Sequence, residues 1–149
     1  MSLTSKALKL LKEAAAADAC KSEPSSSDGI PLLGRIAAGL PIEAIENVER
    51  ISIQSEFGSS DDTFALKVQG DSMTGDGIFD GDFVVCKKSQ NVQNGKIVAA
   101  IVDNDGATVK RFFRESDKIR LEPSNPAYKP IYTQNCEIAG VVVGLMRKI

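Results

Sequence analysis

A series of two-residue turn signals divides the chain after Ile30 into short apolar segments. The turn signals are Asp76-Gly77, Asp80-Gly81, Asn94-Gly95 and Asp105-Gly106. Glycine accepts the positive φ that tight hairpin turns need, and the runs between these pairs are rich in Val, Ile and Phe. Strands that are joined by such short turns pair with their sequence neighbours in antiparallel order. The sequence therefore predicts a mostly β, compact domain with a partly closed antiparallel sheet.

We expect strands at residues 32–37, 64–69, 82–87, 96–102, 107–113, 118–122 and 137–146. The clearest unit is a hairpin in which the apolar run 97–102 enters the loop 103–106 and the chain returns through 107–113. Cys86 lies in the apolar run of one of these strands, which predicts a small, buried side chain.

Residues 1–29 have a different character from the rest of the chain. Apolar residues recur at helical spacing over 3–19, which predicts a short helix, and the polar run 22–29 is typical of a flexible linker. We therefore divide the chain into a helix and linker, 1–29, and a β domain, 30–149. A helix-turn-helix needs at least two packed helices, so we expect no DNA-binding domain in this chain.

Composition argues against several kinds of site and partner. The formal net charge of −2 gives no general attraction to nucleic acid. The chain has no histidine, and Cys20, Cys86 and Cys136 form no CxxC pair, so we expect no metal and no other cofactor. No apolar run is long enough to span a bilayer, and no signal peptide is recognisable. We expect a cytoplasmic protein with reduced cysteines and no membrane partner.

Ser72 is a candidate nucleophile because of its place at the end of a predicted strand. Gly70 breaks the alternating run 64–68 just before the serine, which predicts a tight turn there. Such a turn directs successive backbone N–H groups to one point, where they can stabilise the oxyanion of a tetrahedral intermediate. We predict the N–H groups of Asp71 and Ser72 as these donors. From the serine alone, a hydroxyl that merely satisfies the turn is the simpler interpretation.

Lys110 is the candidate base, since imidazole is not available in this chain. In a strand over 107–113, Lys110 shares a face with Thr108 and Phe112, next to a strand that is almost wholly apolar. Burial disfavours the ammonium, and a neutral amine can take the proton of a serine. The alternative is a lysine that extends from a solvated strand face into water. The S-x-x-K, G-x-S-x-G and P-loop motifs of other active sites do not occur.

Four segments in order make the pattern specific. They are V-Q-G-D-S-M at 68–73, G-I-F-D-G-D at 77–82, A-T-V-K-R-F at 107–112 and L-E-P-S-N-P at 121–126. Together they resemble the LexA and UmuD family of self-cleaving proteins, over about residues 30–149. The resemblance implies the fold of the LexA C-terminal domain, which is similar to that of signal peptidase. It also implies a serine–lysine dyad of Ser72 and Lys110.

The resemblance further implies a peptide bond that the chain cuts in itself. The segment G-R-I-A-A-G-L-P at 34–41 is similar to the family's cleavage site and places the scissile bond between Ala38 and Gly39. An Ala-Gly pair is typical of LexA, whereas UmuD-type proteins tend to have Cys-Gly. The family also implies activation by a RecA filament on single-stranded DNA, and a homodimer formed through the β domain.

The sequence thus predicts the catalytic and dimerisation part of a LexA-like SOS-response repressor, an autocatalytic serine endopeptidase. Its self-cleavage would relieve transcriptional repression after DNA damage, and it would bind DNA only through a helix-turn-helix that this chain lacks. Three alternatives stay open: a UmuD-like polymerase accessory factor, a non-catalytic repressor dimerisation module, and a signal-peptidase-like protease. The last fits poorly, because Thr74-Gly75 follows the Ser-Met pair where a proline is expected. The sequence does not distinguish a fragment from a natural protein without a DNA-binding domain.

Overall fold

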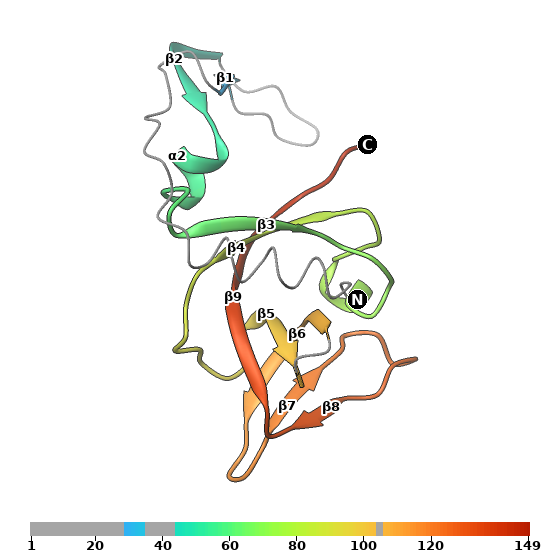
Figure 1. Cartoon of the computed structure of the whole chain (residues 1–149). Coiled ribbons are helices and arrows are strands. Elements are labelled where there is room, and N and C mark those ends of the chain that lie inside the picture. The colour runs from blue at the N-terminus through green and yellow to red at the C-terminus, as the bar shows by residue number, and fades with distance from the viewer. Residues whose placement is uncertain (1–28, 35–43, 104–105) are drawn as a thin grey trace.

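The computed structural model describes residues 29–34, 44–103 and 106–149, and within them the predicted mostly β fold is confirmed (Figure 1). One small sheet pairs β1 (Ile30–Gly34) with β2 (Ala44–Ile51). A second sheet has seven strands, all antiparallel: β3 (Thr63–Lys67), β4 (Phe83–Lys87), β5 (Ile97–Val102), β6 (Gly106–Arg114), β7 (Ile119–Glu122), β8 (Ile131–Thr133) and β9 (Cys136–Met146). Two short helices, α2 (Ile53–Phe57) and η1 (Thr74–Asp76), complete this part of the chain.

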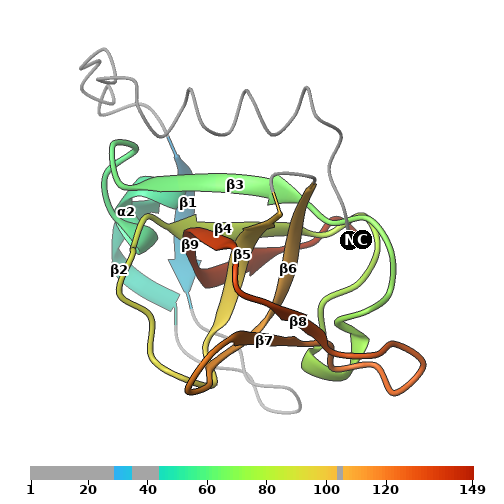
Figure 2. The same cartoon turned by 60° about the horizontal axis from the view of Figure 1, so that its bottom comes forward.

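The large sheet has two halves that are joined by β9. The strand order is β3-β4-β9-β5-β6-β7-β8, so the last strand in the sequence lies between β4 and β5. Figure 1 shows β9 running from β3 and β4 down to the other four strands, and Figure 2 shows how the strand direction turns between the two halves. Among the described residues the edge strands β3 and β8 do not pair with each other, so the sheet curls without closing.

Strand β9 can serve both halves because it contains two irregularities. Its register shifts once opposite Val85 and Cys86 of β4, and once opposite Ala99 and Ala100 of β5. Each shift leaves one extra residue on β9, which bends a strand locally. Close packing follows the bend: a Cβ on Gly144 would lie 2.4 Å from the ring of Phe57 in α2.

The predicted hairpin is confirmed, and both faces of its first strand are buried. Strand β5 pairs with β6 from Ile97↔Arg111 to Val102↔Gly106. Ala99 belongs to one core cluster, together with Val109, whereas Val98 and Ala100 belong to a second cluster. Cys86 is fully buried, as predicted, and burial raises the pKa of its thiol to about 12. This thiol is therefore un-ionised and unreactive at neutral pH.

Several predictions need correction or lie outside the described residues. The strand expected at 32–37 begins earlier, at Ile30, and is described only to Gly34. Strands β2 and β8 and the helix α2 were not predicted. The helix expected at 3–19, Cys20 and residues 22–28 of the predicted linker lie outside the described residues, so the boundary at residue 30 stays a prediction. In the part of the chain that the structure describes, no helix has the length and apolar character needed to cross a membrane.

Candidate active site

Ser72 lies in the long loop between β3 and β4, and hydrogen bonds join the two ends of this loop. The Val68 N–H donates to the Asp82 carbonyl at 2.8 Å, and the Gly81 N–H donates to the Val68 carbonyl at 2.9 Å. Gly70 has a φ of 90°, a conformation that favours glycine, and its N–H donates to the Asp80 carboxylate at 2.7 Å. The chain therefore makes the predicted tight turn just before the serine. Ser72 itself is only 1% exposed.

Lys110 lies on β6, and its side chain reaches this loop. The Lys110 Nζ is 3.0 Å from the Ser72 Oγ, although 38 residues separate them in the sequence. Lys110 pairs with Val98 of β5, and β6 lies between β5 and β7, so the lysine belongs to an interior strand of the sheet. The structure thus brings together the two residues that the sequence predicted as nucleophile and base. The solvated position considered as the alternative for Lys110 is wrong, since this residue is only 4% exposed.

The surroundings of Lys110 favour the neutral amine. Burial lowers the pKa of its side chain from 10.5 to about 8. Two further acceptors fix the position of its Nζ: the Thr108 hydroxyl at 2.7 Å and the Val109 carbonyl at 3.1 Å. A substantial fraction of Lys110 is therefore neutral in mildly alkaline water, with its nitrogen directed at a hydroxyl. The alternation of the strand predicts that Thr108 shares a face with Lys110, but it does not predict this hydrogen bond.

The backbone at Ser72 offers free donors. Within the described part of the chain, the N–H groups of Asp71 and Ser72 donate no hydrogen bond. The carbonyl of Ser72, in contrast, accepts from the N–H groups of Ser124 and Asn125 at 3.0 and 3.1 Å. Donors that are left free beside a nucleophile are what an oxyanion requires. Their role as oxyanion donors stays a prediction.

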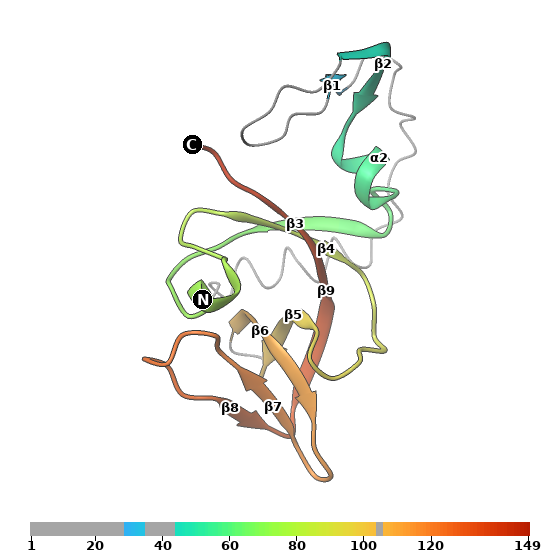
Figure 3. The same cartoon turned by 180° about the vertical axis from the view of Figure 1, so that it is seen from behind.

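The loop between β7 and β8 holds the serine loop from one side. Figures 2 and 3 show these two loops next to each other. The Ser124 hydroxyl accepts from the Asp76 N–H at 3.0 Å, and the Tyr128 hydroxyl bonds to the Asp71 carboxylate. The contact is tight, since a Cβ on Gly75 would lie 2.1 Å from the Ser124 carbonyl oxygen. The motif at 121–126 was recognised in the sequence, but its hydrogen bonds to the serine loop were not predicted.

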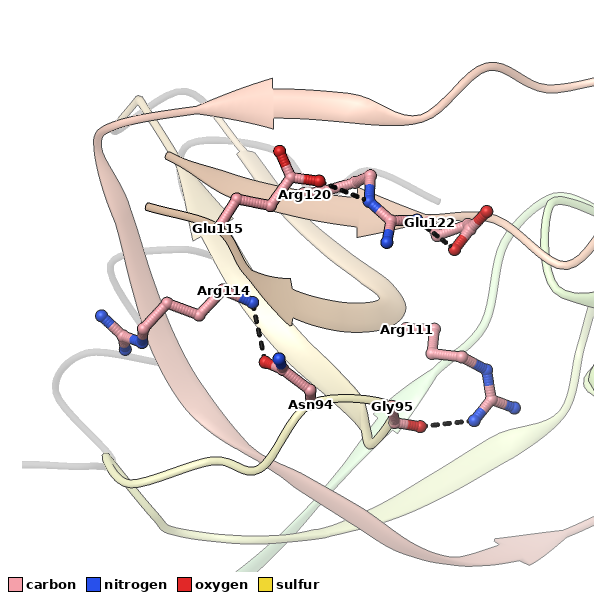
Figure 4. Close-up of polar contacts among 7 residues, drawn as sticks. All are labelled: Asn94, Gly95, Arg111, Arg114, Glu115, Arg120 and Glu122. Atoms are coloured by element: carbon pink, nitrogen blue, oxygen red, sulfur yellow. Dashed lines mark hydrogen bonds and ion pairs between the residues drawn. The ribbon is translucent and has the colours of Figure 1, made fainter. Parts of the chain in front are cut away.

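Two arginines anchor the loop from the other sides. Arg147, just after β9, donates to both carboxylate oxygens of Asp82 at 2.8 and 2.6 Å, and also to the Gly77 carbonyl. The hydrogen bonds from Arg147, above all, lower the pKa of Asp82 to about 2. Arg111 forms an ion pair with Asp76 at 2.5 Å. It also donates to the Gly95 carbonyl, and Figure 4 shows this second contact.

The carboxylates near Ser72 have separate partners and do not converge. Asp76 binds Arg111, Asp80 binds the Gly70 N–H and Asp82 binds Arg147. Among residues 29–34, 44–103 and 106–149, no group of side chains is suited to hold a metal ion. The predicted scissile pair, Ala38 and Gly39, lies outside the described residues.

Comparison with known proteins identifies the family of this chain. Residues 31–143 match the sequence model of a family described as peptidase S24-like. The chain belongs to the peptidase S24-like family. The match includes Ser72, Lys110 and the loop between β7 and β8, whereas Arg147 lies just beyond it.

Relatives of this S24-like chain include proteins named LexA repressor. The protein from Halalkalibacterium halodurans is 49% identical over 121 residues, which are 80% of this chain and 58% of the relative. The protein from Caldicellulosiruptor saccharolyticus is 47% identical and covers 80% of this chain and 59% of its own length. The protein from Leptospira biflexa is 48% identical, with 81% and 60% covered. This chain thus spans about three fifths of the length of the relatives that it matches.

Proposed function

We propose that this chain is the self-cleaving and dimerisation part of a LexA-like repressor of the SOS response. In this proposal it is an autocatalytic serine endopeptidase that hydrolyses its own Ala38–Gly39 bond. The observation that carries the proposal is the buried contact of 3.0 Å between the Lys110 Nζ and the Ser72 Oγ. Relatives that are named LexA repressor support the repressor role over the other roles considered.

The proposed reaction begins with proton transfer from the Ser72 hydroxyl to neutral Lys110. The Ser72 oxygen attacks the Ala38 carbonyl carbon, and the N–H groups of Asp71 and Ser72 stabilise the resulting oxyanion. When the C–N bond breaks, the Lys110 ammonium returns its proton to the Gly39 amine. Water, deprotonated by Lys110, then attacks the ester on Ser72, which releases the Ala38 carboxylate and restores the serine.

Because substrate and catalyst belong to one chain in this proposal, the rate depends on how often the cleavage segment occupies the site. A RecA filament on single-stranded DNA would increase that occupancy after DNA damage. The chain would act as a homodimer in the cytoplasm. In this proposal a helix-turn-helix domain would bind operator DNA, and cleavage would separate that domain from the dimerisation part.

The test is incubation of the purified chain at pH 10, followed by mass spectrometry over time. We expect two fragments whose masses identify the Ala38–Gly39 bond, and no cleavage in Ser72→Ala or Lys110→Ala. Adding RecA with single-stranded DNA and ATP at pH 7 should produce the same fragments. An intact wild-type chain under both conditions, or equal cleavage of Ser72→Ala, would contradict the proposal and favour a non-catalytic dimerisation module.

A further inference from the structure

The side chain of Asn125 binds the peptide unit that carries the Ser72 N–H. Its amide nitrogen donates to the Asp71 carbonyl at 3.0 Å. The carbonyl of Asp71 and the N–H of Ser72 belong to the same planar peptide unit. No peptide bond in the described residues is cis, so these two groups point in opposite directions. A hydrogen bond that holds the carbonyl therefore also sets the direction of the N–H.

The Asn125 side chain is itself held in one orientation. Its carbonyl oxygen accepts from the Ala127 N–H at 3.0 Å, which requires the amide nitrogen to face Asp71. The backbone N–H of Asn125 donates to the Ser72 carbonyl at 3.1 Å. One residue thus holds two successive carbonyls, those of Asp71 and Ser72. Neither peptide unit can rotate without breaking a hydrogen bond to Asn125.

We propose that Asn125 is a positioning residue of the peptidase, which directs the Ser72 N–H at the oxyanion. The inference rests on the proposed function and names a residue that acts through the backbone of another. Oxyanion donors contribute most when they are already oriented before charge develops, because no reorientation is then needed. The amide of Asn125 also polarises the peptide that it binds, which makes the N–H of Ser72 a stronger donor.

Tyr128 supplies a matched control within the same loop. Its hydroxyl also bonds to Asp71, but it binds the side-chain carboxylate and leaves the peptide carbonyl untouched. Tyr128→Phe therefore removes one hydrogen bond between the same two loops without releasing the Ser72 N–H. Asn94→Ala is a distant control, because the side chain of Asn94 accepts from the Arg114 N–H outside the site (Figure 4).

The experiment measures self-cleavage of the whole chain from pH 6 to 11 by mass spectrometry. Asn125→Leu keeps the approximate shape without the donor, and Asn125→Ala removes the side chain. Loss of one oxyanion donor typically lowers rates about 100- to 1000-fold, so a misdirected donor should lower the plateau rate about 10- to 100-fold in both variants. The pH midpoint should stay at the wild-type value, because Lys110 and its contacts are unchanged. Tyr128→Phe and Asn94→Ala should cleave within about threefold of wild type.

Three results would overturn the role of Asn125 while leaving the proposed function intact. These are a wild-type plateau rate in Asn125→Leu, a pH midpoint that moves together with the rate, and an equal loss in Tyr128→Phe. Circular dichroism at the assay temperature reports folding, and unfolding of both Asn125 variants would likewise overturn the proposal in favour of a structural role. If wild type and Asn94→Ala fail to cleave themselves, the proposed function fails instead.

Discussion

Thr108 and Lys110 lie two residues apart on β6, and their side chains are joined by a hydrogen bond of 2.7 Å. The two side chains point to the same side of the strand, as alternation requires. The hydroxyl of Thr108 accepts from the lysine, so it stabilises the ammonium form more than the neutral amine. Thr108 therefore opposes the effect of burial on the pKa of Lys110.

We predict that Thr108→Val lowers the pH midpoint of self-cleavage. Valine has a similar shape and cannot accept a hydrogen bond, so the charged form of Lys110 becomes less stable. The wild-type midpoint should lie near 8, where the pKa of Lys110 lies. A hydrogen bond to a charged group contributes about 1.5 kcal/mol, which corresponds to a fall of about one pH unit. Rates from pH 5 to 11 test this, and a midpoint that rises would contradict it.

Lys110→Met should stabilise the fold at pH 7 while abolishing self-cleavage. The pKa of Lys110 is about 8 in the folded protein and returns to 10.5 on unfolding. Between these values the unfolded chain binds more protons, so the stability of the wild type rises with pH across this window. After allowance for lost hydrogen bonds, we expect a gain of about 1–2 kcal/mol at pH 7.

That gain should disappear as pH rises above 10.5, where the lysine is neutral in both states. Urea unfolding at pH 7 and at pH 11 measures it, with Ser72→Ala as the background so that no chain cleaves itself. A variant that is less stable than its background at pH 7 would show that the hydrogen bonds of Lys110 outweigh the cost of burying it.

Arg147→Met should remove the acid-sensitive part of the protein's stability. The pKa of Asp82 is lowered from 3.8 to about 2 by Arg147, so the pair stabilises the fold above pH 4. This contribution is lost as pH falls through about 2. The difference in melting temperature between wild type and Arg147→Met should therefore be largest near neutral pH and shrink between pH 4 and 2. A difference that stays constant over this range would contradict the assignment.

Gly75→Ala should separate the serine loop from the loop between β7 and β8. The added Cβ would meet the Ser124 carbonyl oxygen at 2.1 Å, which backbone movement must relieve. We expect a loss of about 2–3 kcal/mol in the free energy of unfolding and a strong fall in self-cleavage. Gly144→Ala is the matched control, because the atoms nearest to its Cβ would be those of the Phe57 ring in α2 and not those of the serine loop. It should lose stability yet cleave itself while folded.

Strands could be predicted wherever Val, Ile and Phe stand between glycine turns, as in β4, β5 and β6. Strand β2 escaped prediction because its apolar residues Ala44, Ile45, Val48 and Ile51 follow a helical spacing, with charged residues between them. Only pairing with β1 makes this segment a strand, and single-sequence patterns do not report pairing. Strand β8 has only three residues, which is too short for a period to be recognised.

At the site, the nucleophile and the base could be predicted from the sequence. The residues that hold the serine loop in place could not. The absence of histidine, the alternating pattern of 107–113 and the resemblance to a self-cleaving family indicated Ser72 and Lys110 before their contact was known. The roles of Asn125 and Arg147 depend on hydrogen bonds that join residues 54 and 65 positions apart in the sequence. No local pattern encodes which loop meets which, because the crossing of two distant turns is a property of the folded sheet.

The position of β9 has a consequence for the order in which a newly made chain can assemble. This strand is the only element of the described sheet that hydrogen-bonds to both halves, and it is the last of the nine described strands to leave the ribosome. A nascent chain that stops before Cys136 has Ser72 and Lys110 but lacks the strand that joins β4 to β5 in the sheet. Translation itself should therefore delay the proposed peptidase until synthesis has passed Met146.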